Sequence, residues 1–559
     1  MRETRWPRHS GRAKRDPESR KQNLSLDASL RWHDDPKPLE ISETDPEAFT
    51  RPSPAMEELT ILELQSKMHS GEFTARSISE MYLERIVQLD TQGPSLHSII
   101  ELNPDALAIA DALDEERQAK GARGPLHGVP VLLKDNIDTA DRMMTTAGSL
   151  ALVGSIAARD AFVVRKLREA GVVILGKTNL SEWANFRSLR STSGWSSRGG
   201  QTRNPYALDR NPCGSSSGSA VAVAANLCVA AIGTETDGSI ICPAQTNSVV
   251  GIKPTLGLIS RSGVIPLAHS QDTVGPMART VADAALVLGA LVGSDPHDLV
   301  TAASQGKAYS DYTPFLDPNG LQGARIGIAR NFFGFHEKVD RLMDVCIAMM
   351  RSLGAEIIDP ANVAHAHELR ETELEVLLHE FKADVNQYLA SLSPSVAVHS
   401  LKETLAFNEQ HCDKLMPHFG QELLIMAEAK GPLTSEAYRK ALGINLRLSR
   451  AEGIDATLAK YNLDAIVAPS GGPAWPTDFL NGDHYTGGCS SPAAVAGYPH
   501  ITTPAGYVSG LPVGISFFSG PYQEPTLIKL AFAFEQATRV RRPPQFLAHA
   551  HLDTESQPQ

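Results

Sequence analysis

Regular hydrophobic periodicity begins near residue 56. Thr60 and Glu63 have the spacing of a capping box, and apolar residues then recur three or four positions apart, which predicts an amphipathic helix. A second pattern of this kind, over residues 78–89, predicts another helix. Two helices are therefore expected to open the folded part of the chain.

From about residue 126, short apolar runs appear between Gly, Asn and Asp residues. Residues 129–133 and 171–175 predict buried strands, and residues 162–170 between them predict a helix. Strands that alternate with helices are typical of an α/β sheet. The sequence therefore predicts an α/β fold: a single large domain with a mixed, mostly parallel twisted sheet covered by helices on both faces.

In the second half of the chain, the amino-acid composition and the predicted elements change twice. Residues 336–460 are rich in Glu, Lys, Leu and Ala, which predicts a mainly helical insertion. Residues 510–518 predict a strand, and a last helix over about 525–540 ends before Pro543 and Pro544. We expect one domain over residues 56–545 and a flexible tail over 546–559.

Residues 1–55 differ from the rest. The first 21 residues carry eight basic and three acidic side chains, a net charge of +5 against −12 for the whole chain. Prolines are scattered through the segment, and no apolar run forms a secretory signal. We expect a disordered basic extension, with nuclear or organellar targeting and phosphate contact as weaker alternatives.

The composition narrows the class of protein. Among 559 residues, 42% are hydrophobic and 21% charged, as in an ordinary globular chain. With no run of 18 apolar residues and a net charge of −12, we expect neither a membrane span nor nucleic-acid binding. The six cysteines stand singly, which predicts no disulfide framework and no cysteine zinc site, and favours a reducing, cytoplasmic location.

Two motif matches do not fit their surroundings. Residues 171–178 match a phosphate-binding loop, but the apolar residues 172–175 predict a strand instead. Residues 214–218 match the nucleophile elbow of α/β-hydrolases, which would make Ser216 the nucleophile of a serine esterase, yet Pro212 disfavours the strand that must precede it. The histidines lack metal-binding spacing, so we expect no metal.

The most informative stretch is residues 214–244. A Gly/Ser loop leads into a helix of small residues, a short apolar strand returns, and a second loop ends at Ser239. About eleven helical residues and five strand residues both span roughly 16 Å. Ser215 and Ser239 should therefore lie at the same edge of the sheet, where α/β sheets usually bind ligands.

A serine pair needs a base, and the nearby candidate is Lys134. It follows the apolar run 131–133, so it should lie at the tip of a buried strand. A hydroxyl is a weak nucleophile without a base, and burial can make a lysine neutral enough to serve. A solvated surface lysine is the alternative.

These residues resemble the amidase signature family, most closely its peptide amidase and fungal amidase branch. The resemblance covers roughly residues 56–545. It rests on segments 128–136, 145–149, 176–179, 213–219, 233–244, 249–255, 272–276, 497–499 and 510–514.

The resemblance implies a Ser–cis-Ser–Lys triad and no cofactor. Ser239 would be the nucleophile, Ser215 the bridging residue and Lys134 the base. An oxyanion hole would use backbone N–H groups, and other residues would bind substrate. These further site residues are Thr236, Asp237, Gly238 and Ser239 for the oxyanion, and Ser216 and Ala184 for the substrate.

Four positions depart from the common family pattern, and one of them is Ser217, which replaces a glycine and should matter little if its φ stays negative. Asp237 replaces a glycine, so we expect its side chain to point away from the oxyanion. Ile241 replaces an arginine, which removes an anchor for acidic substrates. Cys213 also replaces a glycine, and we expect a small packing residue rather than a catalytic thiol.

The resemblance implies hydrolysis of a carboxamide to an acid and ammonia or an amine. The substrate would be a small molecule or a peptide amide, and a homodimer stays open. The alternatives are an A-type component of glutamyl-tRNA amidotransferase, a catalytically inactive interaction protein, and the esterase that uses Ser216.

Overall fold

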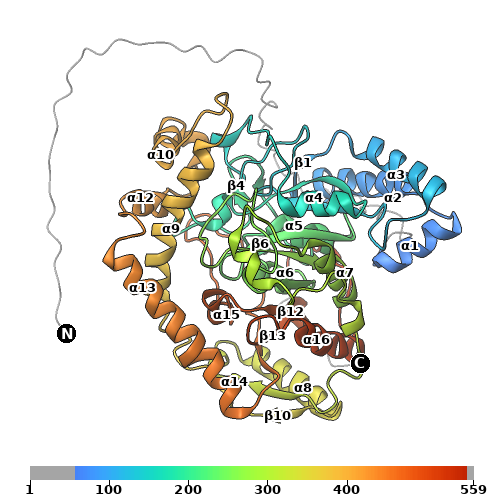
Figure 1. Ribbon diagram of the computed structural model, residues 1–559, viewed down its shortest axis with the longest axis vertical. Helices are drawn as coiled ribbons and strands as arrows, with labels where there is room; N and C mark the ends of the chain where they lie inside the picture. The colour runs from blue at the N-terminus through green and yellow to red at the C-terminus, as the bar shows by residue number, and fades with distance from the viewer. Residues whose placement is uncertain (1–56, 551–559) are drawn as a thin grey trace. The chain divides into compact units, whose positions relative to one another are not determined.

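A computed structural model describes residues 57–550, so the predicted extension 1–55 and residues 551–559 of the predicted tail lie outside the described residues. The main sheet has eleven strands (Figure 1), in spatial order β1 (Ile99–Leu102), β3 (Val173–Thr178), β2 (Pro130–Lys134), β6 (Ala230–Glu235), β8 (Thr273–Ala278), β7 (Val250–Lys253), β12 (His500–Val508), β13 (Leu511–Phe518), β11 (Ala465–Pro469), β9 (Arg325–Ile328) and β10 (Glu356–Ile358). Strands β4 (Trp195–Ser196) and β5 (Gly200–Gln201) form a separate pair.

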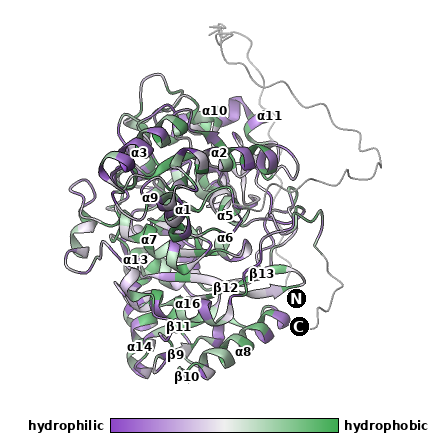
Figure 2. Ribbon diagram, turned by 90° about the vertical axis from the view of Figure 1, so that its right-hand side faces the viewer, coloured by the Kyte–Doolittle hydropathy of each residue, from purple (hydrophilic) through white to green (hydrophobic). Residues whose placement is uncertain are grey.

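The α-helices of the described residues pack around this sheet. They are α1 (Ile61–Ser70), α2 (Ala75–Ile86), α3 (Ala106–Lys120), α4 (Phe162–Glu169), α5 (Ser217–Ala224), α6 (Ile241–Thr246), α7 (Val281–Leu291), α8 (Glu337–Ser352), α9 (Arg370–Ala390), α10 (Leu401–Gln410), α11 (Cys412–Leu415), α12 (Glu422–Glu428), α13 (Glu436–Leu446), α14 (Asp455–Tyr461), α15 (Ser490–Ala496) and α16 (Glu524–Thr538). Many helices carry both hydrophobic and hydrophilic residues, as expected for amphipathic helices on a core (Figure 2).

The central strands are buried on both faces. Every residue of β2, β3, β6, β7 and β8 is buried. Side chains of a strand alternate between the two faces, so full burial requires a cover on each side. Helices α5 and α7 both pack on β6 and β8. The predicted α/β fold with a mixed sheet is confirmed.

The expectation of a mostly parallel sheet is wrong. Of the ten neighbouring strand pairs, four are parallel and six antiparallel. Part of the reason is local. Strands β12 and β13 are joined only by Ser509 and Gly510, both with positive φ, and such a two-residue turn forces an antiparallel hairpin. The β2, β3 and β6 group, which carries the site, is parallel.

Local signals near the start of the domain are confirmed. Thr60 caps α1 and forms the full capping box with Glu63. The second predicted helix is α2, which continues into a short π-helical turn, Val87–Thr91. Burial of Ile61, Leu64 and Met68 fixes α1 against the core.

The segment 336–460 is mainly helical but not entirely so. Strand β10 lies within it and pairs in parallel with β9 of the main sheet. Helices α9, α10, α12 and α13 gather on the left in Figure 1, away from α1 to α3 on the right. Contacts of α9 with α10, α12 and α13 hold this helical group together.

The predicted boundary at residue 545 is too early. Leu547 bridges Ala207 in the parallel direction, and the amide of Leu208 donates to the carbonyl of Leu547 at 2.8 Å. The folded chain therefore continues past the start of the predicted tail.

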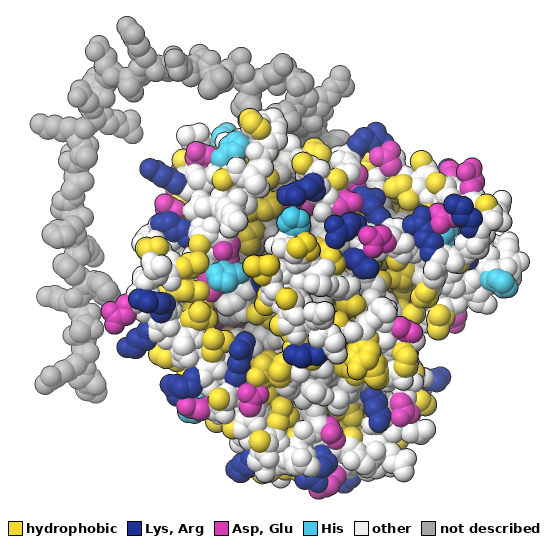
Figure 3. Space-filling model, viewed as in Figure 1, with side chains coloured by type: hydrophobic (Ala, Val, Ile, Leu, Met, Phe, Trp, Pro, Cys, Tyr) yellow, Lys and Arg dark blue, Asp and Glu magenta, His cyan; other side chains and the backbone are white. Residues whose placement is uncertain are grey.

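Over residues 57–550, no helix combines the length and the hydrophobicity that a membrane span requires. Basic and acidic side chains are interspersed on the face shown in Figure 3.

Candidate active site

Lys134 is the last residue of β2 and is completely buried. Its Nζ lies 2.7 Å from Oγ of Ser215 and 3.0 Å from Oγ of Ser216. Thr234, in the neighbouring strand β6, offers its Oγ1 at 2.9 Å and its carbonyl oxygen at 3.2 Å. The predicted strand-tip lysine thus faces the predicted Gly/Ser loop rather than solvent.

The surroundings of Lys134 favour the neutral amine. Burial lowers the pKa of Lys134 to about 7, because the charged form loses its hydration. The carboxyl groups of Asp272 and Glu235 oppose this shift but do not cancel it. No ion pair involves Lys134 within the described part of the chain. A lysine with such a pKa can accept a proton near neutral pH.

The two serine loops meet where the helix and strand lengths predict. Helix α5 leaves the first loop, β6 returns, and the amide of Ser216 donates to the carbonyl of Ser239 at 3.1 Å. The Gly214–Ser215 peptide is cis. Ser239 is 8% exposed, and none of the hydrogen bonds found in residues 57–550 uses its Oγ.

The loop before Ser239 presents free backbone donors. Within residues 57–550, the N–H groups of Asp237, Gly238 and Ser239 donate no hydrogen bond. Glu235 takes up the next two amides, since its Oε2 accepts from Ile240 at 2.7 Å and from the following residue at 3.0 Å. Such a set of unpaired N–H groups can stabilise an anionic oxygen.

The Asp237 side chain is engaged away from these donors. Oγ of Ser491 donates to its Oδ2 at 2.6 Å. Glu373, from α9, lies in hydrogen-bonding contact with the same carboxyl group. Burial and the adjacent carboxyl group of Asp237 raise the pKa of Glu373 well above its ordinary value.

Ser216 and Ala184 lie in different surroundings. Ser216 is fully buried, and its Oγ donates to the carbonyl of Thr234 at 3.0 Å while accepting from that residue's amide at 3.2 Å. In the described chain no strand runs directly into the Gly/Ser loop, as an α/β-hydrolase elbow would require. Ala184 lines a cavity.

The expectation that no disulfide forms is wrong. Cys213 and Cys242 are joined, with Cα atoms 5.9 Å apart and a sequence separation of 29. Cys213 is therefore neither a free thiol nor a simple packing residue. The bond links the Gly/Ser loop to α6, the helix that follows Ser239.

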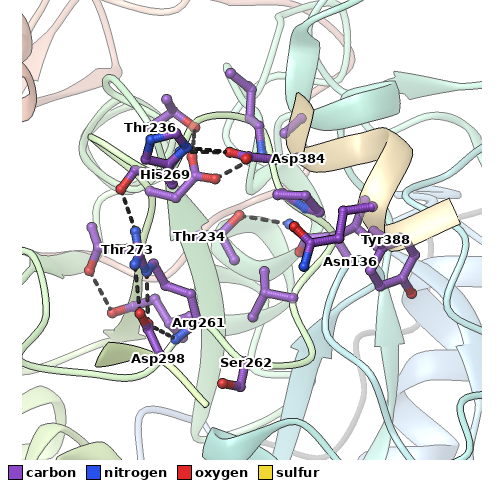
Figure 4. Close-up of a pocket in the computed structure, with 18 of the residues that line it drawn as sticks. Asn136, Thr234, Thr236, Arg261, Ser262, His269, Thr273, Asp298, Asp384 and Tyr388 are labelled. Atoms are coloured by element: carbon purple, nitrogen blue, oxygen red, sulfur yellow. Dashed lines mark hydrogen bonds and ion pairs between the residues drawn. The ribbon is translucent and has the colours of Figure 1, made fainter. Parts of the chain in front are cut away.

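One cavity lies on the Lys134 side of the loops (Figure 4). It has a volume of about 390 Å³, and Asn136, Thr234 and Thr236 form part of its lining. Thr236 Oγ1 donates to Asp272 at 2.6 Å, and Asn136 Nδ2 donates to Thr234 Oγ1 at 3.0 Å. Tyr388 of α9 lines the cavity from another side.

A second cavity of about 310 Å³ is lined by Gly214 and Gly238, the residues just before the two site serines. Asn185 also lines it, whereas the adjacent Ala184 lines the first cavity. The loop that carries Ser239 thus borders both cavities, whereas the loop that carries Ser215 borders only the second.

One group of potential metal ligands occurs in the described residues. His269, Glu380 and Asp384 offer ligand atoms within 4.8 Å of one another. The two ring nitrogens face different carboxylates, Nδ1 at 2.8 Å from Asp384 and Nε2 at 3.4 Å from Glu380. This geometry is typical of ion pairing. Asp384 holds the pKa of His269 above its ordinary value.

The rejected phosphate-loop match is a strand, as expected. Residues 173–178 form β3, and Nζ of the buried Lys177 donates to the carbonyl of Ile137 at 2.6 Å.

Sequence reasoning missed several side chains that support the site. Thr234 and Asn136 lie within the segments that carry the family resemblance. That resemblance could have identified them as candidate site residues, and the structure places them beside Lys134. Glu373 lies more than 130 residues from Asp237 along the chain, and no local pattern connects the two.

Comparison with known proteins gives a consistent result. A protein-family profile described as Amidase matches residues 78–528. A protein named "probable amidase" from Arabidopsis thaliana is 45% identical over 503 residues, covering 88% of this chain and 93% of its own. The structure of a native peptide amidase from Stenotrophomonas maltophilia is 50% identical with a TM-score of 0.84, covering 88% and 99%.

A more distant relative is named for a different role. The A-type component of the glutamyl-tRNA(Gln) amidotransferase from Halorhodospira halophila is 34% identical over 504 residues, covering 86% of this chain and 98% of that protein.

Proposed function

Because the chain belongs to the amidase signature family and is an amidase-type enzyme, we propose that it hydrolyses a carboxamide through an acyl intermediate on Ser239. The products are a carboxylic acid and ammonia or an amine. Lys134 is the base and Ser215 relays the proton.

The observation that carries the proposal is the burial of Lys134 against Ser215. A lysine whose pKa is near 7 and whose Nζ is 2.7 Å from a serine Oγ can take that serine's proton. Ser215 can then accept a proton from Ser239 as Oγ of Ser239 attacks the amide carbon. Deprotonation at the moment of attack is what an unactivated hydroxyl requires.

The unpaired backbone amides of the loop that ends at Ser239 supply the second part of the proposed mechanism, an oxyanion hole. As the carbonyl carbon becomes tetrahedral, its oxygen gains negative charge, and the N–H groups of Asp237, Gly238 and Ser239 can bind it. One such donor is worth roughly 3 kcal/mol in other acyl-transfer enzymes. The family resemblance adds the N–H of Thr236 to this set.

The remaining steps release the amine, hydrolyse the acyl-enzyme and return each residue of the site to its starting protonation state. Ser215 passes its proton to the departing nitrogen while the C–N bond breaks, which leaves the acyl group on Ser239. Water attacks the acyl carbon, gives a proton to the same relay, and releases the acid. The proton returns to Oγ of Ser239, and Lys134 is again neutral.

We place the substrate among C-terminally amidated peptides. Support comes from the peptide amidase of Stenotrophomonas maltophilia, at 50% identity over nearly its whole length. The amidotransferase role is a weaker candidate because the identity to that relative is 34%. The esterase alternative is disfavoured because Ser216 Oγ is held by Lys134 and Thr234.

The test is a substrate screen with the purified protein alone. An aryl amide, an aliphatic amide and a C-terminally amidated dipeptide are incubated separately, and ammonia is measured. We expect ammonia from the amidated dipeptide, and none with Ser239→Ala. Absence of ammonia from all three amides, with ester hydrolysis that Ser216→Ala removes, would refute the proposal.

A further inference from the structure

The second cavity has an unusual charge balance. Two carboxylic acids line it, Asp237 and Asp483, and no Lys, Arg or His does. Neither acid forms an ion pair with any residue in 57–550. The cavity wall therefore carries two carboxyl groups and no basic side chain to balance them.

The carboxyl group of Asp237 lies beside that of Glu373. Burial and the neighbouring Asp237 raise the pKa of Glu373 well above its ordinary value, and Oγ of Ser491 donates to Oδ2 of Asp237 at 2.6 Å. Lys253 attracts Asp237 electrostatically, but its ammonium group donates only to the carbonyl of Pro254 at 3.2 Å. Oδ1 of Asp237 is buried and has no amide or alcohol donor in the described chain.

Asp483 is fixed on another wall of the cavity. Ser193 donates to it through both Oγ, at 2.5 Å, and the backbone amide, at 3.0 Å. Nε1 of Trp475 donates to its Oδ1 at 3.2 Å. Burial raises the pKa of Asp483, and these donors oppose that shift in part because they stabilise the ionised form.

Aromatic rings complete the cavity wall. Trp475 and Tyr485 lie edge to face with centroids 5.8 Å apart, and both line the cavity. Aromatic faces attract cations through the ring quadrupole. Ionised carboxylates and aromatic rings together form the surroundings in which an ammonium or guanidinium group is stabilised.

The position of the cavity connects this charge to the reaction. Gly238 and Gly214 line it and directly precede Ser239 and Ser215. A substrate whose carboxamide carbon lies at Ser239 can therefore place a neighbouring group in the cavity. A volume of about 310 Å³ admits a lysine-sized side chain but not a large peptide.

We propose that this cavity is a subsite for a positively charged side chain of the substrate, with Asp237 and Asp483 as its counter-charges. This rests on the proposed amidase function and narrows its substrates to amides that carry an ammonium or guanidinium group near the scissile bond. The same charge disfavours acidic amides, because two carboxylates in one small cavity repel a third.

The test compares amides that differ only in charge. Nα-acetyl-lysinamide, Nα-acetyl-norleucinamide and Nα-acetyl-glutamic acid α-amide are assayed for kcat/KM. We expect the lysine amide to exceed the norleucine amide by about tenfold or more, and the glutamate amide to be poorest. In Asp237→Asn and in Asp483→Asn the lysine-to-norleucine ratio falls toward one. Asp413→Asn, an equal charge change at an exposed site, keeps the wild-type ratio.

A binding measurement separates this inference from the proposed function. Calorimetric titration of Ser239→Ala with the lysine and norleucine amides should give about a tenfold tighter Kd for the lysine amide. If norleucinamide is hydrolysed and no lysine preference appears in rate or binding, the subsite is refuted while the amidase function stands. If no amide is hydrolysed but the lysine amide still binds more tightly, the subsite stands and the proposed function fails.

Discussion

Three fully buried lysines lie on neighbouring parts of one sheet, yet their surroundings differ. Lys177 on β3 donates to a carbonyl and a threonine hydroxyl, and Lys253 on β7 donates to the next residue's carbonyl. Lys134 on β2 contacts two serine hydroxyls. Burial lowers the pKa of all three. The serine contacts therefore distinguish Lys134 as the candidate base.

Removing the Lys134 amine should stop catalysis. We expect Lys134→Ala to lower kcat by at least a factor of about 10³, because residues that act as a unit fail together. The measurement is ammonia release from an amidated dipeptide at saturating substrate. Lys177→Met removes an equally buried amine that touches no serine, and its folded fraction should keep the wild-type kcat. Equal losses in both variants would argue against a specific role for Lys134.

The pH dependence follows from the same residue. Only the neutral amine can accept a proton, and the pKa of Lys134 is about 7. Below pH 7 the amine is protonated and inactive, and above it the neutral form dominates. We therefore expect kcat/KM to rise tenfold per pH unit below about pH 7 and to level off above it. A profile that falls as pH rises from 6 to 8 would contradict a lysine base.

The position of helix α5 depends on a close approach between its backbone and two neighbouring backbone segments. A Cβ added at Gly218, in the first turn of α5, would lie 2.2 Å from the carbonyl oxygen of Ser98 and 2.5 Å from that of Asn179. Only glycine fits there, because neither backbone can move without breaking the sheet edge. This contact holds the Gly/Ser loop against β3.

Because of this contact, we expect alanine substitutions at two different glycines to change the free energy of unfolding in opposite directions. Gly218→Ala should lower the free energy of unfolding by about 2 kcal/mol or more, since overpacking against backbone is costly. Gly443→Ala, in the exposed part of α13 with no atom within 4 Å of the new Cβ, should raise it by up to about 1 kcal/mol. Urea unfolding measures both. A neutral Gly218→Ala would show that the two backbones are not in tight contact.

Several helices and strands could be predicted from local sequence patterns because the pattern of each lies within its own segment. The capping box of α1 and the apolar runs of β2 and β3 need no distant partner to be recognised. The lengths of α5 and β6 sufficed to bring Ser215 and Ser239 to one edge. The family resemblance, rather than periodicity, supplied their assigned roles.

Features that depend on distant contacts were not predictable. Cys213 and Cys242 are 29 residues apart and meet only because two loops converge, whereas spacing rules look for close pairs. Strand direction depended on how β7, β8 and β12 are ordered in the sheet, which periodicity does not encode. Asp483 and Glu373 reach the site from segments that carry no recognisable motif.

At the scale of the whole molecule, the two ends of the described chain are tied together. Arg541 pairs with Glu58 through two hydrogen bonds, of 2.8 and 2.7 Å. Its other nitrogen donates to the carbonyl of Ser248 at 2.7 Å. Burial alone would raise the pKa of Glu58, but Arg541 outweighs this and holds it below its ordinary value. The pair therefore links the first helices to the last segment of the domain.

The loss of stability caused by removing this link should decrease as the pH falls. A carboxyl group with a depressed pKa stabilises the fold above its ordinary pKa and loses this contribution as the pH falls. Glu58→Gln should cost about 2 kcal/mol of unfolding free energy at pH 7 and less at a pH below the ordinary pKa of glutamate. The exposed Glu84→Gln should change stability little at either pH. An equal cost of Glu58→Gln at both values would exclude the ionic contribution.

In the proposed reaction Ser239, activated through Ser215 and Lys134, forms the acyl-enzyme. The most direct test is labelling with a fluorophosphonate, followed by intact-mass and peptide mass spectrometry. We expect one adduct, on the peptide that contains Ser239, which disappears in Ser239→Ala and persists in Ser216→Ala. An adduct that survives Ser239→Ala and is lost in Ser216→Ala would contradict the proposed reaction.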